Sequence, residues 1–332
     1  SEIIRKFEDK LSKYCNAKYC LLTSSGTTAL HLAAIACGIE SGDEVIVPSL
    51  SYIATANVVA YCQATPVFVD VNLEDFQIDI KKIEEKITDK TKAILPVHLY
   101  GGVPQLSEIE KLAKKYKLKI IHDSAEALGS KYNNLHSVSS PDVGILSFFP
   151  NKIITTGEGG ALITNNEGIY KKVSKLRSQG LKNKNDYKHD EIGYNYRITA
   201  MSAALGYNQI DKIEKHLESK SKIFNTYLEE LGNLGVRFQK HSNEIDPSFW
   251  LTVAVFNENV DVKKLKNYLF QNNVDTRRVF YPLHLQEPYR KYGHGVYFNS
   301  EKIYNFGLCL PTYPDLSDEN LEYIITKIKK FI

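Results

Sequence analysis

Strand-like and helix-like segments alternate in this chain between residues 19 and 122. Apolar runs at 19–23, 44–47 and 65–69 are typical of buried strands, and each is followed by a segment whose apolar residues have helical spacing, as at 78–87. Because a helix between two strands can return the chain to the same edge of a sheet, this order predicts a mainly parallel α/β sheet. In such sheets ligands bind beyond the carboxyl ends of the strands.

The order of the predicted elements changes after Thr199, which is suited to cap a long helix predicted over residues 200–231. That helix leads into a region where strands and helices follow one another without regular alternation, which is typical of an α+β domain. We therefore predict a large α/β domain over residues 1–210 and a smaller C-terminal α+β domain over residues 211–332.

The segment SFFPNKIITTGEGG, residues 147–160, places Lys152 between two predicted buried strands, 143–147 and 161–164. Burying an ammonium group is costly unless the group is paired or loses its proton. A desolvated lysine deprotonates readily, and its free amine can form a Schiff base with an aldehyde. The alternative is a surface loop with a solvated lysine, and the segment alone does not decide between the two.

Three other features stand at the ends of predicted strands. Residues 24–28 join a strand to a helix N-terminus, where N–H groups and hydroxyls can hold an anion, although an ordinary helix cap has the same composition. Tyr52 and Asp123 follow two further strands. An anion site, a flat ring, a carboxylate and an isolated lysine are what pyridoxal 5′-phosphate requires. We expect Asp123 to keep its ring nitrogen protonated, and Lys152 to bind its aldehyde and move the proton.

Seven segments of this sequence also resemble, in order and spacing, those of the DegT/DnrJ/EryC1/StrS family of sugar aminotransferases. The resemblance implies a fold type I pyridoxal phosphate enzyme that works as a homodimer with shared active sites. It further implies transfer of an amino group from L-glutamate to a nucleotide-linked keto sugar. The segments, which cover nearly the whole chain, are SSGTTALH, PSLSYIATAN, PVHLYG, HDSAEALGS, SFFPNKIITTGEGGALITN, HDEIGYNYR and VFYPLHLQ.

The resemblance implies roles for individual residues. Lys152 would be the Schiff-base lysine, Asp123 the partner of the pyridinium nitrogen, and Tyr52 the ring stacked on the cofactor. The further residues that it implies are Gly26, Thr27 and Ser147 for the cofactor phosphate, Asn195 and Arg197 for the phosphate or substrate of the partner subunit, and His284 for the sugar pocket.

Glu126 departs from the commoner family pattern, in which glutamine or histidine lies near the cofactor's phenolic oxygen. A carboxylate facing a phenolate would be repulsive, so a proton must be shared between them. This acid, with Asn151-Lys152 and TTGEGG at 155–160, resembles the perosamine synthase branch, which aminates C4 of GDP-4-keto-6-deoxymannose. The segment HDEIGYNYR also resembles the branch acting on UDP-linked 4-keto sugars for legionaminic acid and bacillosamine. We expect the first activity, for surface polysaccharide synthesis, and keep the second as an alternative.

Three other functions match parts of the sequence. A sugar dehydratase of the same family would carry histidine in place of Lys152. A non-catalytic sensor that keeps the fold would be expected to lose Asp123 or Lys152, and both are present. A nicotinamide-dependent oxidoreductase would need Gly-x-Gly-x-x-Gly after the first strand, and residues 24–28 lack it. Members of the family usually have roughly 20 more residues before the first predicted helix, and these often help to wall the sugar site.

Composition excludes other classes of protein. Lysine and arginine total 42 against 39 acidic residues, a balance that argues against nucleic acid as a partner. No apolar run approaches the length of a membrane span, and no signal peptide opens the chain. The cysteines are odd in number and form no Cys-x-x-Cys pair, which favours a reduced cytoplasmic protein without structural zinc. His122 has no second His or Cys at ligand spacing, so we expect no metal site.

Overall fold

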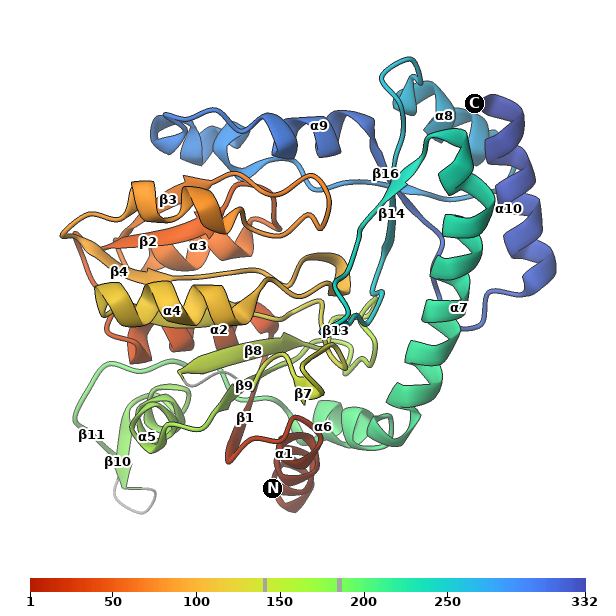
Figure 1. The fold of residues 1–332 in the computed structure, drawn as a ribbon. Helices are drawn as coiled ribbons and strands as arrows, with labels where there is room; N and C mark the ends of the chain where they lie inside the picture. Colours follow the sequence, from red (N-terminus) through yellow and green to blue (C-terminus); the bar gives the residue numbers. More distant parts are fainter. Residues whose placement is uncertain (140–141, 184–186) are drawn as a thin grey trace.

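The fold centres on a seven-stranded sheet in the order β1-β9-β8-β5-β4-β2-β3 (Figure 1). The computed structural model describes residues 1–139, 142–183 and 187–332. Neighbouring strands from β8 to β3 are parallel, whereas β9 is antiparallel to both of its neighbours. The mainly parallel α/β sheet predicted from the sequence is therefore confirmed. Its strands are β1 (Tyr19–Thr23), β2 (Glu44–Pro48), β3 (Thr65–Val69), β4 (Thr91–Ile94), β5 (Lys119–Asp123), β8 (Val143–Ser147) and β9 (Gly160–Thr164).

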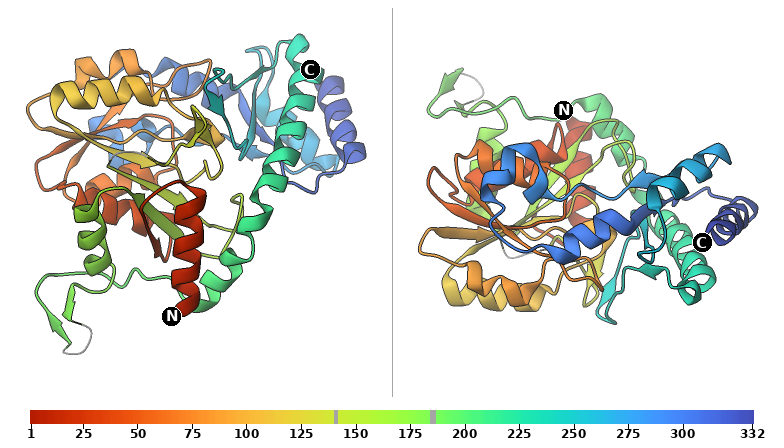
Figure 2. Two further views of the ribbon diagram at one scale, coloured as in Figure 1. Left: turned by 60° about the horizontal axis from the view of Figure 1, so that its bottom comes forward. Right: turned by 90° about the horizontal axis from the view of Figure 1, so that it is seen from above.

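Helices cover both faces of this sheet (Figure 2). On one face α2 packs with Val45 and Val47 of β2, and on the other face Ile109 of α4 packs with Ile46 and Ile94. Successive side chains of a strand point to opposite faces, so β2 contributes to both cores. The helices of this part are α1 (Glu2–Tyr14), α2 (Gly26–Ala36), α3 (Ala54–Tyr61), α4 (Leu106–Tyr116) and α5 (Glu167–Leu176).

The long helix predicted over residues 200–231 is wrong, because the chain breaks it into α6 (Ala200–Tyr207), a 3-10 turn and α7 (Ile213–Leu231). Gln209 lies in the break. Its side-chain amide donates to the carbonyls of Leu205 and Thr155 at 2.9 and 2.7 Å, and its Oε1 accepts from Thr155 N at 3.1 Å. The break is thus tied to the segment that carries Lys152, a contact that helical spacing does not reveal.

The helix predicted over residues 78–87 is also wrong, because this segment forms two 3-10 turns, Ile80–Lys82 and Glu84–Lys86. Ile78 pairs with Val71 in an isolated bridge, which holds the chain extended there. The Asp79 carboxylate then accepts from Lys81 N and caps a short turn instead of a full helix.

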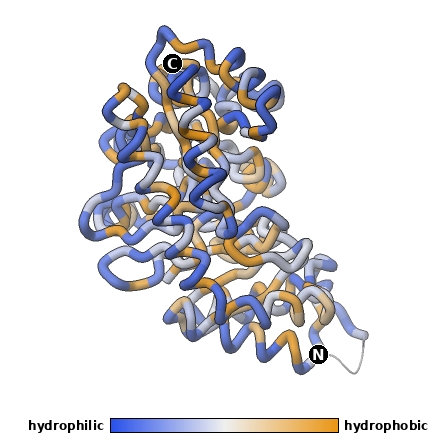
Figure 3. Tube along the Cα trace, turned by 90° about the vertical axis from the view of Figure 1, so that its right-hand side faces the viewer, coloured by the Kyte–Doolittle hydropathy of each residue, from blue (hydrophilic) through white to orange (hydrophobic). Residues whose placement is uncertain are grey.

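The small domain contains a four-stranded antiparallel sheet in the order β12-β14-β16-β15, covered by helices with a core of their own. Figure 3 views the molecule from the right-hand side of Figure 1. Hydrophilic and hydrophobic residues alternate along the outer helices in this view, as expected where one face of a helix covers a sheet. The elements are β12 (Arg237–Phe238), β14 (Thr252–Val255), α8 (Val262–Gln271), β15 (Arg277–Arg278), β16 (Gly307–Leu310) and α10 (Asp318–Phe331).

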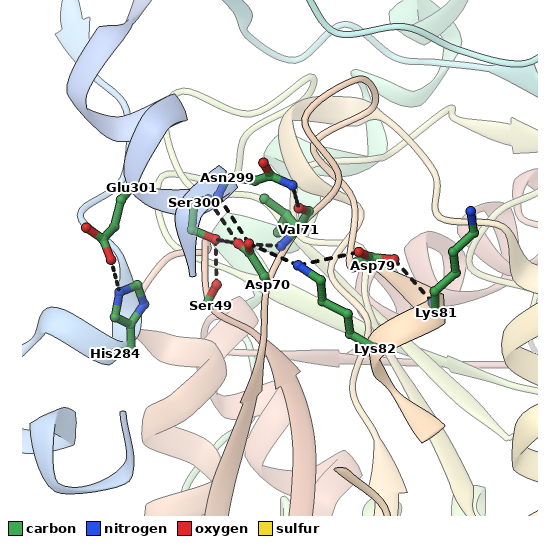
Figure 4. A network of polar contacts seen from close by, with 10 residues as sticks. All are labelled: Ser49, Asp70, Val71, Asp79, Lys81, Lys82, His284, Asn299, Ser300 and Glu301. Atoms are coloured by element: carbon green, nitrogen blue, oxygen red, sulfur yellow. Dashed lines mark hydrogen bonds and ion pairs between the residues drawn. The ribbon is translucent and has the colours of Figure 1, made fainter. Parts of the chain in front are cut away.

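Residues 280–306 return from the small domain to the large one and end in α9 (Phe298–Phe306). Leu283 N donates to the Ser49 carbonyl at 2.7 Å. The buried Asp70 carboxylate accepts from the backbone N–H groups of Asn299 and Ser300 at 3.1 and 3.0 Å (Figure 4). This return segment lies within the range predicted for the small domain, but it packs beside β2 and β3.

Short strands make two further small sheets that the sequence did not predict. One joins β6 (Lys131–Tyr132), β7 (Leu135–His136) and β13 (Ile245–Asp246), and so links the large domain to the small one. The other pairs β10 (Leu181–Asn183) with β11 (Lys188–His189). Within the described part of the chain, no helix combines the length and the apolar character needed to cross a membrane.

Candidate active site

A cavity of about 440 Å³ lies at the carboxyl ends of β5 and β8. The segment between β8 and β9 forms one side of it. That segment is held by hydrogen bonds from Lys152 N to the Phe149 carbonyl and from Thr156 N to the Phe148 carbonyl, both 3.0 Å. Of the residues predicted for the site, the cavity is lined by Gly26, Thr27, Tyr52, Asp123, Glu126, Ser147 and Lys152.

The Lys152 side chain is largely buried, between a carboxylate and an indole ring. Its Nζ lies 3.9 Å from Glu126 Oε1 and 3.6 Å from the centre of the Trp250 ring. Trp250 is fixed in turn, since its Nε1 donates to the Asn151 carbonyl at 2.7 Å. Burial lowers the pKa of Lys152, and the charges of Glu126 and Asp123 act in the opposite direction. The amine therefore loses its proton more readily than a solvated lysine does, as a nucleophilic amine must.

Asp123 is the last residue of β5, and its carboxylate is held rigidly in the cavity wall. Oδ2 accepts from Thr55 Oγ1 at 2.9 Å, and Oδ1 accepts from Ala125 N at 3.2 Å. Thr55 is positioned by Ser51, whose hydroxyl lies 2.8 Å away. Burial raises the pKa of Asp123, whereas these two hydrogen bonds and the charge of Lys152 lower it. A cationic nitrogen bound in the cavity would supply this buried carboxylate with a counterion.

Glu126 completes a buried acid–base pair with Lys152. Its Oε2 accepts from Tyr100 N at 2.7 Å, which leaves Oε1 facing the amine. Burial raises the pKa of Glu126 to about 7, against the lowering effect of Lys152. An acid that titrates near neutrality beside an amine of lowered pKa can store a proton for it.

The N-terminus of α2 forms an anion cradle at the other end of the cavity. Ser25 and Thr28 satisfy each other in a capping box, at 3.1 and 3.0 Å. Within the described residues, the N–H groups of Gly26 and Thr27 donate to nothing, and both residues line the cavity. A Cβ on Gly26 would lie 2.9 Å from the Ser147 Cβ and would fill the cradle. Free N–H groups, a ring-facing carboxylate and a buried amine together fit pyridoxal phosphate.

Replacing Gly26 by alanine is expected to weaken binding of pyridoxal phosphate, because the added methyl group collides with Ser147 at the cradle. Overpacking of this kind costs about 1–3 kcal/mol, so the dissociation constant should rise roughly tenfold or more. Absorbance titration of the cofactor-free protein measures it. Gly232→Ala is the control, since a Cβ there meets its nearest atom at 3.6 Å. Equal affinity of the Gly26 and Gly232 variants for pyridoxal phosphate would show that the cradle does not bind the cofactor.

A row of aromatic rings in contact with one another extends from Tyr52 to Trp250, which covers Lys152. The Tyr52 ring lies 5.8 Å from Phe280, Phe280 stacks on Tyr100 at 5.4 Å, and Tyr100 stacks on Trp250 at 6.4 Å. Tyr52 is 58% exposed, so one face of its ring is free for a ligand. Trp250 and Phe280 were not predicted for the site. They come from the small domain and the return segment. Phe280 lies within the segment VFYPLHLQ but was not singled out there, and no quoted segment contains Trp250.

The structure does not bring the remaining predicted residues to the cavity of this chain. Asn195 and Arg197 are exposed and touch Ser178 and Thr23 only through backbone bridges. His284 is buried in the return segment, with Nε2 3.3 Å from Glu301 Oε1 (Figure 4). Burial lowers the pKa of His284, and Glu301 opposes that shift. The roles expected of these three residues stay predictions.

The chain is similar to known proteins in its family profile, in its sequence and in its fold. The profile of the DegT/DnrJ/EryC1/StrS aminotransferase family matches residues 2–329. The GDP-perosamine synthases of Escherichia coli O157:H7 and Caulobacter vibrioides are 41% and 38% identical to it, over 99% of this chain and 90% of each relative. The PLP form of the putative sugar aminotransferase Spr1654 from Streptococcus pneumoniae superimposes with a TM-score of 0.93 at 27% identity. That match covers 99% of this chain and 92% of Spr1654.

Proposed function

Since this chain belongs to the DegT/DnrJ/EryC1/StrS aminotransferase family, we propose that it moves the amino group of L-glutamate to C4 of GDP-4-keto-6-deoxymannose and so forms GDP-perosamine. Membership confirms the predicted transaminase class and the pyridoxal phosphate cofactor. The observation that carries the choice of substrate is the identity of 41% and 38% to GDP-perosamine synthases over 99% of the chain. The acid at Glu126, predicted to mark this branch, lies within reach of Lys152.

The lining of the cavity supports a proposed role for residues of this chain toward each part of the cofactor. Gly26, Thr27 and Ser147 would hold the phosphate, Tyr52 the face of the ring, and Asp123 the ring nitrogen. When bound, pyridoxal phosphate supplies an aldehyde that carries the amino group and a ring that accepts electrons from the substrate carbon.

Lys152 supplies the amine and moves the proton. As a free base, its Nζ would carry a proton from the donor carbon to the cofactor carbon, and in the second half-reaction from the cofactor carbon to the sugar carbon. Glu126 Oε1, 3.9 Å away, could exchange a proton with this amine, because the pKa of the carboxyl lies at about 7. The Trp250 ring covers Nζ and limits the access of water to it.

Replacing Glu126 by glutamine is expected to shift uptake of pyridoxal phosphate by the cofactor-free protein to lower pH. Uptake needs the neutral amine of Lys152, and the charge of Glu126 raises the pKa of that amine. Glutamine removes the charge but can still accept from Tyr100 N, so the amine loses its proton at a lower pH. The pH of half-maximal uptake rate, followed by absorbance, measures this. Glu84→Gln, on the surface, is the control, and an unchanged midpoint in the Glu126 variant would contradict the pairing.

We further propose a homodimer in which Asn195 and Arg197 complete the site of the partner subunit. Both side chains are exposed, and they lie between Ile192 and Met201, whose apolar side chains are 90% and 84% exposed. A second copy of the chain would cover that apolar surface. All five cysteines are free, in keeping with the reducing cytoplasm as the place of this reaction.

The test of the function follows the absorbance of the bound cofactor. L-glutamate should abolish the long-wavelength band of the pyridoxal phosphate form, and GDP-4-keto-6-deoxymannose should restore it. Restoration by UDP-linked 4-keto sugars and not by the GDP sugar would favour the alternative substrate branch. A band that glutamate leaves unchanged would refute the proposed amino donor. Protein that binds no pyridoxal phosphate would instead favour a non-catalytic role.

A further inference from the structure

A second, larger cavity of about 780 Å³ lies beside the candidate active site. The two cavities share Asn151, Lys152, Trp250 and Arg277 in their linings, so a ligand in the larger one would lie next to the reactive amine. Most of the other residues that line it belong to the small domain. They include residues 309–314, which form the end of β16 and the segment that follows it. The roles given above to the cofactor-binding residues leave this space unexplained.

Lys220, on α7, is a buried cation in the lining of the larger cavity. The residue is only 4% exposed, and its Nζ donates to the carbonyls of Trp250, at 3.0 Å, and Thr312. An ammonium group has three N–H donors, and the third has no acceptor in the described part of the chain. Burial is the sole cause that lowers the pKa of Lys220, to about 8, with no carboxylate charge to oppose it.

This situation differs from that of Lys152, whose buried charge is offset by Glu126 at 3.9 Å. A buried ammonium without a counterion is costly, and two carbonyl oxygens compensate only part of its lost hydration. The two carbonyl oxygens that accept from Nζ favour the charged ammonium form of Lys220. An anionic ligand in the cavity would supply the missing counterion.

Arg277, on β15, brings a second cation to the same cavity. Its side chain is exposed and lines both cavities, and among the described residues it has no ion pair. A guanidinium group matches the two oxygens of a carboxylate. The single carboxylate in the lining is that of Asp275, which is exposed, so cations outnumber anions around this space.

We propose that Lys220 and Arg277 form an anion-binding subsite. It would bind a carboxylate of the amino donor, a small dicarboxylate of the glutamate type. The proposal rests on the proposed function and deepens it. A carboxylate bound there would lie in the cavity that Lys152 borders, where the donor amine has to arrive. Both residues would be positioning residues, because they orient the donor without touching the reacting atoms.

The depth of Lys220 favours a carboxylate over the phosphates of the nucleotide sugar. Its amine lies in a recess where the whole residue is 4% exposed, so only a slender chain end can reach it. The carboxylate of an amino acid is such an end. The two phosphates of a GDP-sugar are flanked on both sides by bulky groups, the nucleoside and the sugar, and cannot enter the recess.

Glutarate is the probe for this subsite, because it carries both carboxylates of the donor but no amine that could displace Lys152. We expect Lys220→Met and Arg277→Met each to raise the dissociation constant of glutarate for the pyridoxal phosphate form about tenfold or more, measured by calorimetry. Lys220→Arg, which keeps the charge, should recover part of the affinity. Trp250 is the chain's single tryptophan, so its fluorescence should also respond to glutarate.

Lys215→Met is the matched control, since it removes an exposed lysine from the same helix. It should bind glutarate as the unchanged protein does, and all variants should keep the cofactor absorbance. If Lys220→Met does not fold, Arg277→Met at an exposed position still decides the question.

Equal glutarate affinity in the methionine variants, or no glutarate binding by the unchanged protein, would overturn the subsite. So would a loss of GDP affinity in Lys220→Met with glutarate binding intact, because the site would then serve the nucleotide. These failures are distinct from failure of the proposed function, which is tested by the glutamate-dependent loss of the cofactor band in the unchanged protein.

Discussion

Replacing Lys152 by alanine is expected to leave a folded protein that transfers amino groups at least about 10⁴-fold more slowly. The buried amine is the one group in the described cavity that can both bind an aldehyde and carry a proton between carbon atoms. Its neighbours cannot replace it, because Glu126 and Asp123 are carboxylates and the Trp250 ring carries no base. Single-turnover formation of 2-oxoglutarate from L-glutamate measures the rate, because this readout does not depend on a cofactor band that Lys152 itself creates.

The loss should not come from unfolding. Without Lys152 the pKa of Glu126 rises further, since the amine lowers it together with the hydrogen bond from Tyr100 N, and this favours the protonated carboxyl. Glu126 then leaves no unpaired buried charge behind, and Asp123 keeps its hydrogen bonds from Thr55 and Ala125, so thermal unfolding should change little. Lys152→Arg separates charge from nucleophilicity, because a guanidinium keeps the charge but cannot become a free amine. Either variant with activity within tenfold of the unchanged protein would exclude Lys152 as the reactive amine.

Local signals in the sequence were enough to predict the sheet and the residues at its carboxyl edge. The runs that became β1, β2, β3 and β8 are short, apolar and bounded by turn residues, so strand length and burial could be predicted from each run alone. Tyr52 and Asp123 could then be placed at one edge, since parallel strands end together. The family resemblance added the role of each residue.

What could not be predicted depends on contacts between residues that are far apart in sequence. The helix over residues 200–231 breaks where Gln209 binds the backbone of Thr155, and helical spacing carries no information on such a contact. Trp250 contacts Lys152 only because the small domain packs against the segment that carries this lysine. Lys220 has the helical spacing of a core position in α7, yet its charge alone would assign it to the solvated face.

The same limit applies to residues that are predicted to act between subunits. Asn195 and Arg197 stand away from the cavity of their own chain, and His284 lies in the return segment beside Glu301. A motif can mark such residues as important. Their proposed place in a site would depend on a second chain or on the bound sugar, neither of which is determined by the local pattern of one sequence.

Replacing Asp123 by asparagine is expected to slow amino transfer by about 10³-fold while the cofactor still binds. Asparagine has nearly the same shape, and its Oδ1 can accept from Ala125 N. Its amide can donate to the Thr55 hydroxyl, which is free to turn because Ser51 Oγ lies 2.8 Å away as another acceptor. The fold and the cavity are therefore kept, and only the negative charge is lost.

The lost charge is what should matter for the rate. A buried carboxylate keeps a ring nitrogen protonated, and a protonated ring accepts electrons from the substrate carbon far better than a neutral one. Lys152 is untouched, so the cofactor band should appear at normal intensity while its loss with L-glutamate becomes slow. Thr55→Val removes one hydrogen bond to the same carboxylate and should give a smaller loss, of roughly tenfold.

Asp142→Asn is the matched control for the change at Asp123, because Asp142 Oδ2 accepts from Ile120 N at the opposite end of β5. That variant should react within about twofold of the unchanged protein, because Asp142 lies away from the cavity and asparagine can still accept from Ile120 N. A fast reaction in Asp123→Asn would mean that the ring nitrogen needs no counterion here. Amino transfer would then depend on Glu126 and Lys152 alone. In that case Thr55→Val should also react as fast as the unchanged protein.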